Sequence, residues 1–397
     1  MNNNDHEICI VGGCGHVGLP LGIALADNGK QVALYDINEN SINKINSGMM
    51  PFMEHGADKL LKKLVGKRLT ATNDQSVISK ADTVIMVIGT PVDEHLNPRI
   101  GDIIRAIDEI MEYLRDDQLL VMRSTLYPGV TDKVHDHLLR HNKRTLVAFC
   151  PERIAEGYAL TELYELPQIV AGCSAEATDR ASELFKTLTQ QIVVTKPMEA
   201  ELAKLFTNTW RYINFAISNQ FYMIANSNGF DFYNIYDAMT KDYPRLKSFA
   251  KAGLAAGPCL FKDTMQLSSF SENSFFLGHS AMLVNEGLPD YVVHETKKKH
   301  DLSKSVVAIL GMAFKGNNDD PRESLSYKLK KRFEIEALEV ICHDPYVRDD
   351  TLVDLTEVKR RADIIVIAAP HAVYADEDWS LKVVIDMWNF YGNGGLI

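Results

Sequence analysis

The chain has 397 residues, which is enough for two or three domains with separate hydrophobic cores. Its apolar fraction of 46% and charged fraction of 24% are typical of globular proteins. The formal net charge of -11 argues against nucleic acid or an anionic membrane as a partner, because both bind basic surfaces.

The six cysteines are scattered, without the paired spacing of a disulfide framework or a zinc site, so we expect no bound metal. The first residues, MNNNDHEICIVGG, lack the basic and apolar regions of a secretion signal. No stretch reaches the roughly 18 apolar residues that span a bilayer. We therefore expect a cytoplasmic protein without a membrane partner.

The first half of the sequence alternates apolar runs with helical segments. This pattern is typical of a parallel sheet covered by helices on both faces. It predicts a doubly wound α/β domain over residues 1–196, with a helix beginning near His16. The strands are expected at 7–12, 31–36, 81–89, 118–125, 144–151, 167–172 and 190–195.

The pattern changes near residue 197. No strong helix breaker occurs between Pro197 and Gly229, which predicts one long connecting helix. Helical segments continue to about residue 298, so a helical domain is expected over 197–298, followed by a linker at 297–301. A second doubly wound α/β domain is expected over 299–397, with strands at 304–311, 338–345, 362–370 and 382–388.

A glycine-rich turn joins the first strand to the first helix. In the pattern GxGxxG, the glycines permit a tight turn and let a pyrophosphate approach the helix N-terminus. The second strand ends at Asp36, near the spacing of a carboxylate that binds both ribose hydroxyls and repels a 2′-phosphate. The pattern predicts NAD, and the alternative is a purely structural turn. The predicted cofactor contacts of this turn are Gly13, Gly15, His16, Val17 and Gly18.

Three loops follow strands at the carboxyl edge of the first sheet, where open α/β sheets bind ligands. IGTP (88–91) and RSTLYPG (123–129) make Thr90 and Thr125 candidates for ligand contacts, although isolated threonines are commonly turn residues. CPERIAEG (150–157) places Glu152 on the same edge, either as an acid/base or as a solvated loop residue.

On the long helix, Lys204 and Asn208 are four residues apart and share one face. A cation and an amide donor can stabilise negative charge that develops on a substrate oxygen. Glu201 lies three residues before Lys204, so a surface ion pair is the alternative interpretation.

The stretch AAGPCLFKDT (255–264) presents Cys259 after a Gly-Pro turn and before Lys262 and Asp263. Its thiol is either a nucleophile or one more small buried apolar group. Further on, LGMAFKGNNDDPRES (310–324) places Lys315 and Arg322 in one loop, where two cations suit phosphate groups or are simply solvated.

Seven motifs in this order resemble the UDP-glucose/GDP-mannose dehydrogenase family over essentially the whole chain: GxGxxG, GTP, STLYPG, PERIAEG, AKLFTN, GPCLFKD and GMAFKGNNDDPRES. The resemblance implies a Rossmann-like NAD domain, a central helical domain that forms a homodimer, and a C-terminal Rossmann-like domain that binds the nucleotide sugar. It also implies oxidation of the C6 hydroxyl of a UDP-sugar to the uronic acid, a precursor for polysaccharide synthesis.

The resemblance also implies roles for individual residues. Cys259 would attack the sugar aldehyde to give a thiohemiacetal and then a thioester, with a nearby lysine favouring the thiolate. Asp263 and Thr125 would position water. The implied catalytic residues are Cys259, Lys204, Asn208, Asp263, Glu152 and Thr125. The implied cofactor contacts beyond the glycine turn are Asp36, Thr90, Thr125, Lys262 and Arg322. The implied substrate contacts are Glu152, Arg153, Lys204, Asn208, Arg245 (across the dimer), Gly257, Cys259, Phe314 and Lys315.

The sequence departs from the family pattern at Ala255, Ala256 and Pro258, where many members are richer in glycine, and at Trp388, where some carry arginine. The signals for the sugar conflict. PER and the 14-residue spacing from Arg245 to Cys259 resemble members acting on UDP-N-acetylhexosamines, whereas CLFKD resembles the UDP-glucose and GDP-mannose branch. We expect a UDP-N-acetylhexosamine (ManNAc or GlcNAc), with UDP-glucose as the alternative.

Two alternatives come from other functional classes. A two-electron hydroxyacid dehydrogenase can share a nucleotide domain followed by a helical domain with a lysine, but it would need neither Cys259 nor a third domain. A non-catalytic nucleotide-sugar binding protein is the other alternative, and the intact set of candidate catalytic residues speaks against it.

Overall fold

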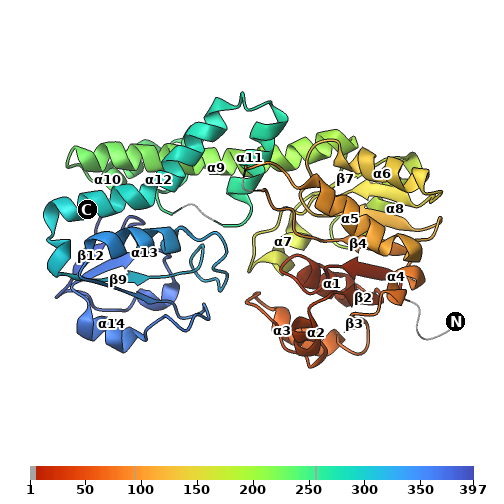
Figure 1. The fold of residues 1–397 in the computed structure, drawn as a ribbon, viewed down its shortest axis with the longest axis horizontal. Coiled ribbons are helices and arrows are strands. Elements are labelled where there is room, and N and C mark those ends of the chain that lie inside the picture. Colours follow the sequence, from red (N-terminus) through yellow and green to blue (C-terminus); the bar gives the residue numbers. More distant parts are fainter. Residues whose placement is uncertain (1–5, 94, 255–256) are drawn as a thin grey trace. The chain divides into compact units, whose positions relative to one another are not determined.

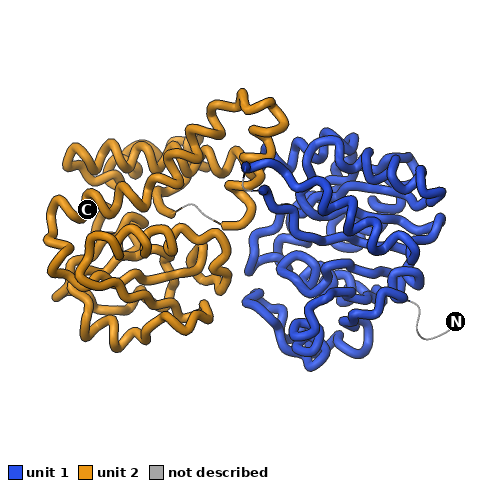
Figure 2. Tube along the Cα trace, in the orientation of Figure 1, with its two compact units in different colours: residues 1–207 blue, residues 208–397 orange. Residues whose placement is uncertain are grey.

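The computed structural model describes residues 6–93, 95–254 and 257–397. The chain divides into two compact units, residues 1–207 and 208–397, and the boundary falls within helix α9 (Pro197–Ser227) (Figures 1 and 2). The expected long helix over 197–228 is therefore confirmed. Ala255 and Ala256 lie outside the described residues. No helix in the described part of the chain combines the length and apolar character that crossing a membrane requires.

The first unit alternates strands and helices as the apolar runs predict (Figure 1). Its elements before α9 are β1 (Ile8–Val11), α1 (Gly18–Asp27), β2 (Val32–Tyr35), α2 (Glu39–Asn46), α3 (Ala57–Leu64), β3 (Leu69–Thr72), α4 (Ser76–Lys80), β4 (Thr83–Met86), α5 (Ile100–Ile110), the 3-10 turn η1 (Met111–Tyr113), β5 (Leu119–Met122), α6 (Val130–Arg140), β6 (Leu146–Phe149), α7 (Ala159–Glu165), β7 (Gln168–Gly172), α8 (Ala175–Lys186) and β8 (Ile192–Val194).

The strand order of this sheet, among the described residues, is β3-β2-β1-β4-β5-β6-β7-β8. Strand β1 pairs in parallel with both β2 and β4, with Ile8 opposite Val32 on one side and Thr83 on the other. The chain therefore reverses its direction of winding between β1 and β4. In open α/β sheets, ligands bind beyond the carboxyl ends of the strands at such a switch point.

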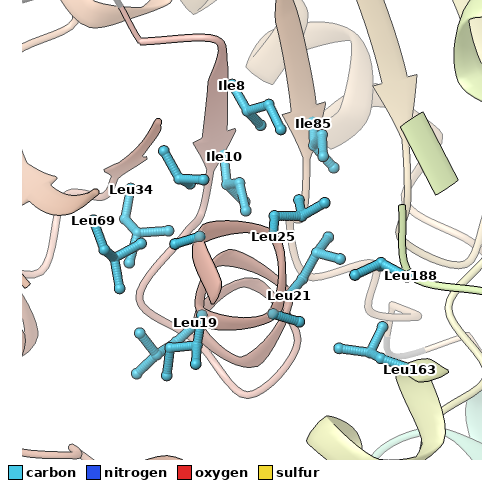
Figure 3. Close-up of a cluster of buried hydrophobic side chains, with 14 of the residues drawn as sticks. Ile8, Ile10, Leu19, Leu21, Leu25, Leu34, Leu69, Ile85, Leu163 and Leu188 are labelled. Carbon is cyan, nitrogen blue, oxygen red and sulfur yellow. The ribbon is translucent and has the colours of Figure 1, made fainter. Parts of the chain in front are cut away.

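Side chains of β1 alternate between two cores, because successive residues of a strand point to opposite faces. Ile8 and Ile10 pack in one cluster with Leu21 and Leu25 of α1 (Figure 3). Cys9 and Val11 belong to the opposite cluster, which α5 and α6 cover. Helices on both faces confirm the doubly wound class and explain why the central strands are apolar throughout.

Two details of the first sheet differ from the sequence expectation. Strand β3 was not anticipated, since LTAT alternates buried and exposed positions in only four residues. Strand β7 was expected to be parallel, but it runs antiparallel to β6, with Phe149 opposite Ala171. Because β7 is antiparallel to β6, it begins at the carboxyl edge of the sheet, where the chain leaves β6.

The second unit contains the end of α9, further helices and a parallel sheet. Its remaining elements are α10 (Phe232–Thr240), η2 (Pro244–Leu246), α11 (Leu260–Phe270), α12 (Phe276–Lys299), η3 (Leu302–Lys304), β9 (Val306–Leu310), α13 (Leu325–Glu336), β10 (Glu339–His343), α14 (Leu355–Arg361), β11 (Ile364–Ile367), η4 (Ala372–Tyr374) and β12 (Val383–Ile385). The strand order among the described residues is β10-β9-β11-β12, with all neighbours parallel.

Helices and sheet of the second unit bury one shared core. Tyr222 of α9, Phe232 of α10 and Leu288 of α12 belong to the same cluster as Val307 and Ile309 of β9. The linker expected at 297–301 is wrong in its first half, because α12 continues to Lys299. Lysine is a good helix former, and three lysines in the last turn face the negative end of the helix dipole.

Candidate active site

Three of the four glycines in the turn after β1 have no room for a side chain, and Gly15 is the exception. A Cβ on Gly12, whose φ is +75°, would lie 1.9 Å from a backbone oxygen, and a Cβ on Gly13 or Gly18 would lie 2.7 Å from one. The nearest such atom for Gly15 is 3.9 Å away. The turn is therefore packed on its inner side and open at Gly15, as the close approach of a pyrophosphate requires.

The other groups of the predicted cofactor site lie around this turn. Asp36 directly follows β2, and its Oδ2 accepts a hydrogen bond from the Cys14 amide at 3.0 Å, so the carboxylate is fixed beside the glycines. The ring of His16 stacks on Phe52 with centroids 4.0 Å apart. Val17 precedes α1, which begins at Gly18 rather than at residue 16. The packed turn and the adjacent carboxylate fit an NAD molecule.

Ser124 joins two of the loops at the carboxyl edge of the sheet. Its hydroxyl accepts from the Ile88 amide at 2.8 Å and donates to the Ile88 carbonyl at 2.7 Å. The loops that carry Thr90 and Thr125 are thereby held together, and Thr125 is buried. The sequence analysis missed Ser124, because a serine next to a candidate threonine has no distinguishing signal of its own.

Glu152 is clamped by a buried arginine. Its Oε2 accepts from Arg123 Nη2 at 2.5 Å, and its Oε1 accepts from the amides of Arg153 and Ile154 at 2.7 and 3.1 Å. Arg123 is fully buried and also donates to Gln168 at 2.9 Å. A solvated loop position for Glu152 is therefore excluded. Both carboxylate oxygens are engaged, and the charge is balanced as a buried carboxylate requires.

A second buried glutamate, Glu54, binds the end of the loop that carries Glu152. Glu54 accepts from the amides of Gly157 and Leu160 at 3.0 and 3.3 Å, and the His55 amide donates to the Gly157 carbonyl at 3.0 Å. Burial raises the pKa of Glu54, although these backbone hydrogen bonds oppose the shift. The sequence analysis gave no role to Glu54, since its partner lies a hundred residues away.

The first turns of α9 are fixed by Glu201. Its carboxylate accepts from the Gly129 amide at 2.5 Å, and from the amide and hydroxyl of Thr131 at 2.8 and 2.6 Å. Burial raises the pKa of Glu201 despite these hydrogen bonds. Glu201 and Lys204 are both buried, so the surface ion pair considered from the sequence is excluded.

Four predicted catalytic or cofactor residues meet where α9 contacts α11. Asn208 Nδ2 donates to Asp263 Oδ2 at 2.6 Å, and Lys262 Nζ lies 3.2 Å from Asp263 Oδ1. Cys259 precedes α11, and its carbonyl accepts from the Asp263 amide at 3.0 Å. Asp263 is fully buried. The amide of Asn208 is thus already engaged by Asp263, a contact that its spacing from Lys204 does not reveal.

Cys259 is the exposed cysteine among the six, all of which are thiols within the described residues. Burial raises the pKa of each of the others to about 12, so they remain protonated at neutral pH. These are Cys9, Cys14, Cys150, Cys173 and Cys342. The interpretation of Cys259 as a small buried apolar group is therefore wrong.

The backbone before Cys259 packs against two aromatic rings of the C-terminal region. Gly257 has a φ of +108°, and a Cβ there would lie 2.7 Å from the ring of Phe314. Gly253 has a φ of +152°, and its Cβ would lie 2.3 Å from the ring of Trp388. Trp388, one of the departures from the family pattern, thus packs on Gly253.

The remaining predicted cations are distributed over both units. Lys315 Nζ lies 5.5 Å from the centroid of the Phe314 ring, and Arg322 Nη2 binds Asp320 Oδ2 at 2.6 Å. Arg245 is exposed and donates to Tyr243 Oη at 3.0 Å. In the first unit, the Arg153 guanidinium donates to the Pro167 carbonyl, and burial lowers its pKa.

A pocket of about 350 Å³ opens beside Gly257 in the second unit. Its lining among the described residues includes neither Cys259 nor Phe314. The pocket therefore adjoins Gly257 rather than the Cys259 thiol. Its lining residues are Gly257, Phe261, Glu286, Glu323, Ser324, Leu325, Tyr327, Lys328 and Lys331.

The packed glycine turn and Asp36 at the switch point of a doubly wound sheet define an NAD-binding oxidoreductase of the Rossmann class. Three family models match the chain, describing the NAD binding domain (residues 6–189), the central domain (198–286) and the UDP binding domain (308–393) of one family. The chain belongs to the UDP-glucose/GDP-mannose dehydrogenase family. It is an NAD-dependent nucleotide-sugar dehydrogenase, so the expected cofactor and enzyme class are confirmed.

Similar proteins extend over almost the whole chain. The UDP-N-acetyl-D-mannosamine dehydrogenase of Methanocaldococcus jannaschii is 33% identical to this chain. The alignment covers 95% of this chain and 88% of that protein. The structure of UDP-D-ManNAc dehydrogenase from Pyrococcus horikoshii has a TM-score of 0.86 at 31% identity, covering 94% and 91%. The UDP-glucose dehydrogenase structure from Pyrobaculum islandicum has a TM-score of 0.88 at 24% identity, covering 97% and 94%, and shows the shared fold.

The difference in exposure among the cysteines predicts selective alkylation. Limiting iodoacetamide at neutral pH should modify Cys259 at least about tenfold faster than the partly exposed Cys173, because thiolate character and access control the rate. Peptide mapping by mass spectrometry measures both sites in one sample. Equal rates at the two sites would contradict the account of Cys259 as the reactive thiol.

Proposed function

We propose that the enzyme oxidises the C6 hydroxyl of a UDP-N-acetylhexosamine, ManNAc or GlcNAc, to the uronic acid in a four-electron reaction through Cys259. The observation that carries the proposal is the cluster of Asn208, Lys262 and Asp263 at the start of the helix that Cys259 precedes. The names of the Methanocaldococcus jannaschii and Pyrococcus horikoshii relatives, at 33% and 31% identity, support the N-acetylhexosamine. UDP-glucose remains the alternative substrate.

The reaction needs a covalent step because an aldehyde must first form a tetrahedral adduct before it can lose hydride. NAD supplies the hydride acceptor for both oxidations. In the first, the C6 alcohol loses a hydride and a proton and becomes the aldehyde. The Cys259 sulfur then bonds to the aldehyde carbon, and the thiol proton goes to the aldehyde oxygen, which gives the thiohemiacetal.

The second oxidation removes a hydride and a proton from the thiohemiacetal and leaves a thioester on Cys259. Water adds to the thioester carbon, the carbon–sulfur bond breaks, and the sulfur recovers its proton as the acid is released. We assign Lys204 and Asn208 to the oxyanion of these adducts, and Asp263 with Thr125 to the water. Asp263 suits this role because Asn208 and Lys262 hold its buried carboxylate in the first turn of the helix that Cys259 precedes.

We assign Glu152 as an acid/base whose carboxylate is fixed by hydrogen bonds. Its carboxylate is bound by Arg123 and by two backbone amides, so proton transfer requires it to exchange one of these partners. We assign Arg153, on the same loop, to the substrate. The proposal keeps Lys262 and Arg322 as cofactor contacts. It keeps Phe314, Lys315 and Gly257 as nucleotide-sugar contacts, with Arg245 reaching the sugar of a second subunit.

A substrate panel tests this function. UDP-ManNAc, UDP-GlcNAc, UDP-glucose and GDP-mannose are each incubated with the enzyme and NAD, and NADH and product mass are measured. The expected result is a UDP-N-acetylhexosaminuronic acid formed with about two NADH per sugar, because each oxidation transfers one hydride. A ratio near one would contradict the four-electron reaction, and acid from UDP-glucose alone would select the alternative substrate.

The second unit carries an apolar surface that supports a homodimer through the central helices. Trp210, Ile217, Phe221 and Ile224 of α9 are exposed, and their spacings of seven, four and three residues place them on one helix face. The stripe continues into a groove of about 300 Å³ between α9 and α10. Exposed apolar surface of this extent marks an interaction site.

The same proposal places the enzyme in the cytoplasm, where reducing conditions keep Cys259 a thiol.

A charge in this stripe should dissociate the dimer. Ile224→Glu would bury a carboxylate in the proposed interface, which costs several kcal/mol when it is unpaired, so light scattering should give the monomer mass. Leu381→Glu is the matched control, since Leu381 is 95% exposed and lies outside the stripe. A monomeric parent protein, or an Ile224→Glu variant that keeps the parent mass, would contradict this interface.

A further inference from the structure

Phe314 and Lys315 lie in the loop between β9 and α13, whose backbone is irregular. Gly311 has a φ of +92°, and Asn317 has a φ of +55°. A Cβ on Gly311 or Gly316 would lie 2.4 Å from a backbone oxygen. Such backbone persists only where surrounding groups fix it. In this loop, the fixing groups are a buried carboxylate and a buried imidazole.

Asp344 follows β10 and binds the beginning of the loop. Its Oδ2 accepts from the amides of Met312 and Ala313 at 2.6 and 3.0 Å, while its Oδ1 accepts from the amides of Tyr346 and Val347 at 2.8 and 2.9 Å. Burial alone would raise the pKa of Asp344, but hydrogen bonds from His371 and from backbone amides lower it to about 2. The carboxylate is therefore ionised whenever the enzyme works.

His371 follows β11 and binds the far end of the same loop. Its Nδ1 accepts from the Asn317 amide at 2.9 Å, so the ring proton lies on Nε2, which is 2.9 Å from Asp344 Oδ2. The Asn317 side chain in turn accepts from the Ala372 amide at 2.8 Å. The imidazole is therefore a neutral bridge between the Asp344 carboxylate and the loop backbone.

A buried Asp–His pair can also serve proton transfer, as in hydrolase triads, but the geometry here excludes that role. The nitrogen that a substrate would use, Nδ1, is occupied by the Asn317 amide. Both side chains are fully shielded from solvent. A group that transfers protons must reach the reacting atom directly or through one water. The pair therefore acts on the backbone and not on a substrate.

We propose that Asp344 and His371 are positioning residues for UDP binding. They fix the loop backbone at residues 312–313 and at 317, on both sides of Phe314 and Lys315, so that these two side chains are already placed when the nucleotide sugar arrives. Preorganisation of this kind lowers the cost of binding. The inference rests on the proposed function, in which Phe314 and Lys315 contact the UDP-sugar.

Two isosteric substitutions separate the two hydrogen bonds of His371. His371→Asn keeps an acceptor near the Nδ1 position and removes the donor to Asp344. His371→Gln keeps a donor near the Nε2 position and removes the acceptor for the Asn317 amide. Trp379→Phe is the matched control, because it removes a buried hydrogen bond of the same domain, from Nε1 to Tyr391 Oη at 2.8 Å, and leaves the loop contacts in place.

Isothermal titration with UDP and with NAD measures the effect, and a melting curve confirms that each variant is folded. Both His371 variants should bind UDP about tenfold more weakly, which is a loss of about 1.4 kcal/mol of binding free energy. Their NAD affinity and their kcat at saturating sugar should be unchanged. Trp379→Phe should bind UDP normally. Parental UDP affinity in both His371 variants would overturn the inference, as would equal losses for UDP and NAD. A parent enzyme that binds no UDP would instead contradict the proposed function.

Discussion

The hydrogen bond from Asn208 to Asp263 connects the two helices on which the proposed chemistry depends. Asn208 lies one turn after Lys204 on α9, and Asp263 lies one turn after Cys259 on α11, so a single 2.6 Å contact sets the relation between the two turns. Asp263 is fully buried, which makes the contact intolerant of a lost partner, because an unpaired buried carboxylate costs several kcal/mol. Cys259 itself is exposed, whereas the Asp263 carboxylate one turn further on is buried and hydrogen-bonded.

Buried carboxylates that bind backbone amides recur in loops of both units that carry candidate site residues. Glu201 binds the start of α6, Glu54 binds the loop that carries Glu152, and Asp344 binds the loop that carries Phe314. Loops at the ends of parallel strands have many unpaired amides, and a carboxylate can accept several of them at once. Burial and hydrogen bonds shift the pKa of these carboxyls in opposite directions. Burial prevails at Glu201 and Glu54, whose pKa is raised, and hydrogen bonds prevail at Asp344, whose pKa is lowered.

The local sequence pattern was sufficient to predict the doubly wound sheets, the long helix and the glycine turn. Apolar periodicity and glycine spacing involve only residues that are close together in the sequence. The direction of β7 and the continuation of α12 through Lys299 depend on packing in the folded chain, which no short window of sequence contains. Ser124 and His371 were missed for a related reason. Each acts on a residue at least 36 positions away, so only the folded chain shows the partner.

The central claim is that Cys259 carries the second oxidation, and the Cys259→Ser variant tests it most directly. The measurement is the yield of uronic acid and of the C6 aldehyde from a UDP-N-acetylhexosamine, together with NAD affinity. A serine hydroxyl is a much weaker nucleophile than a thiolate at neutral pH, so the account predicts a loss of acid of at least about a hundredfold with normal NAD binding. Undiminished acid production by the variant would contradict it.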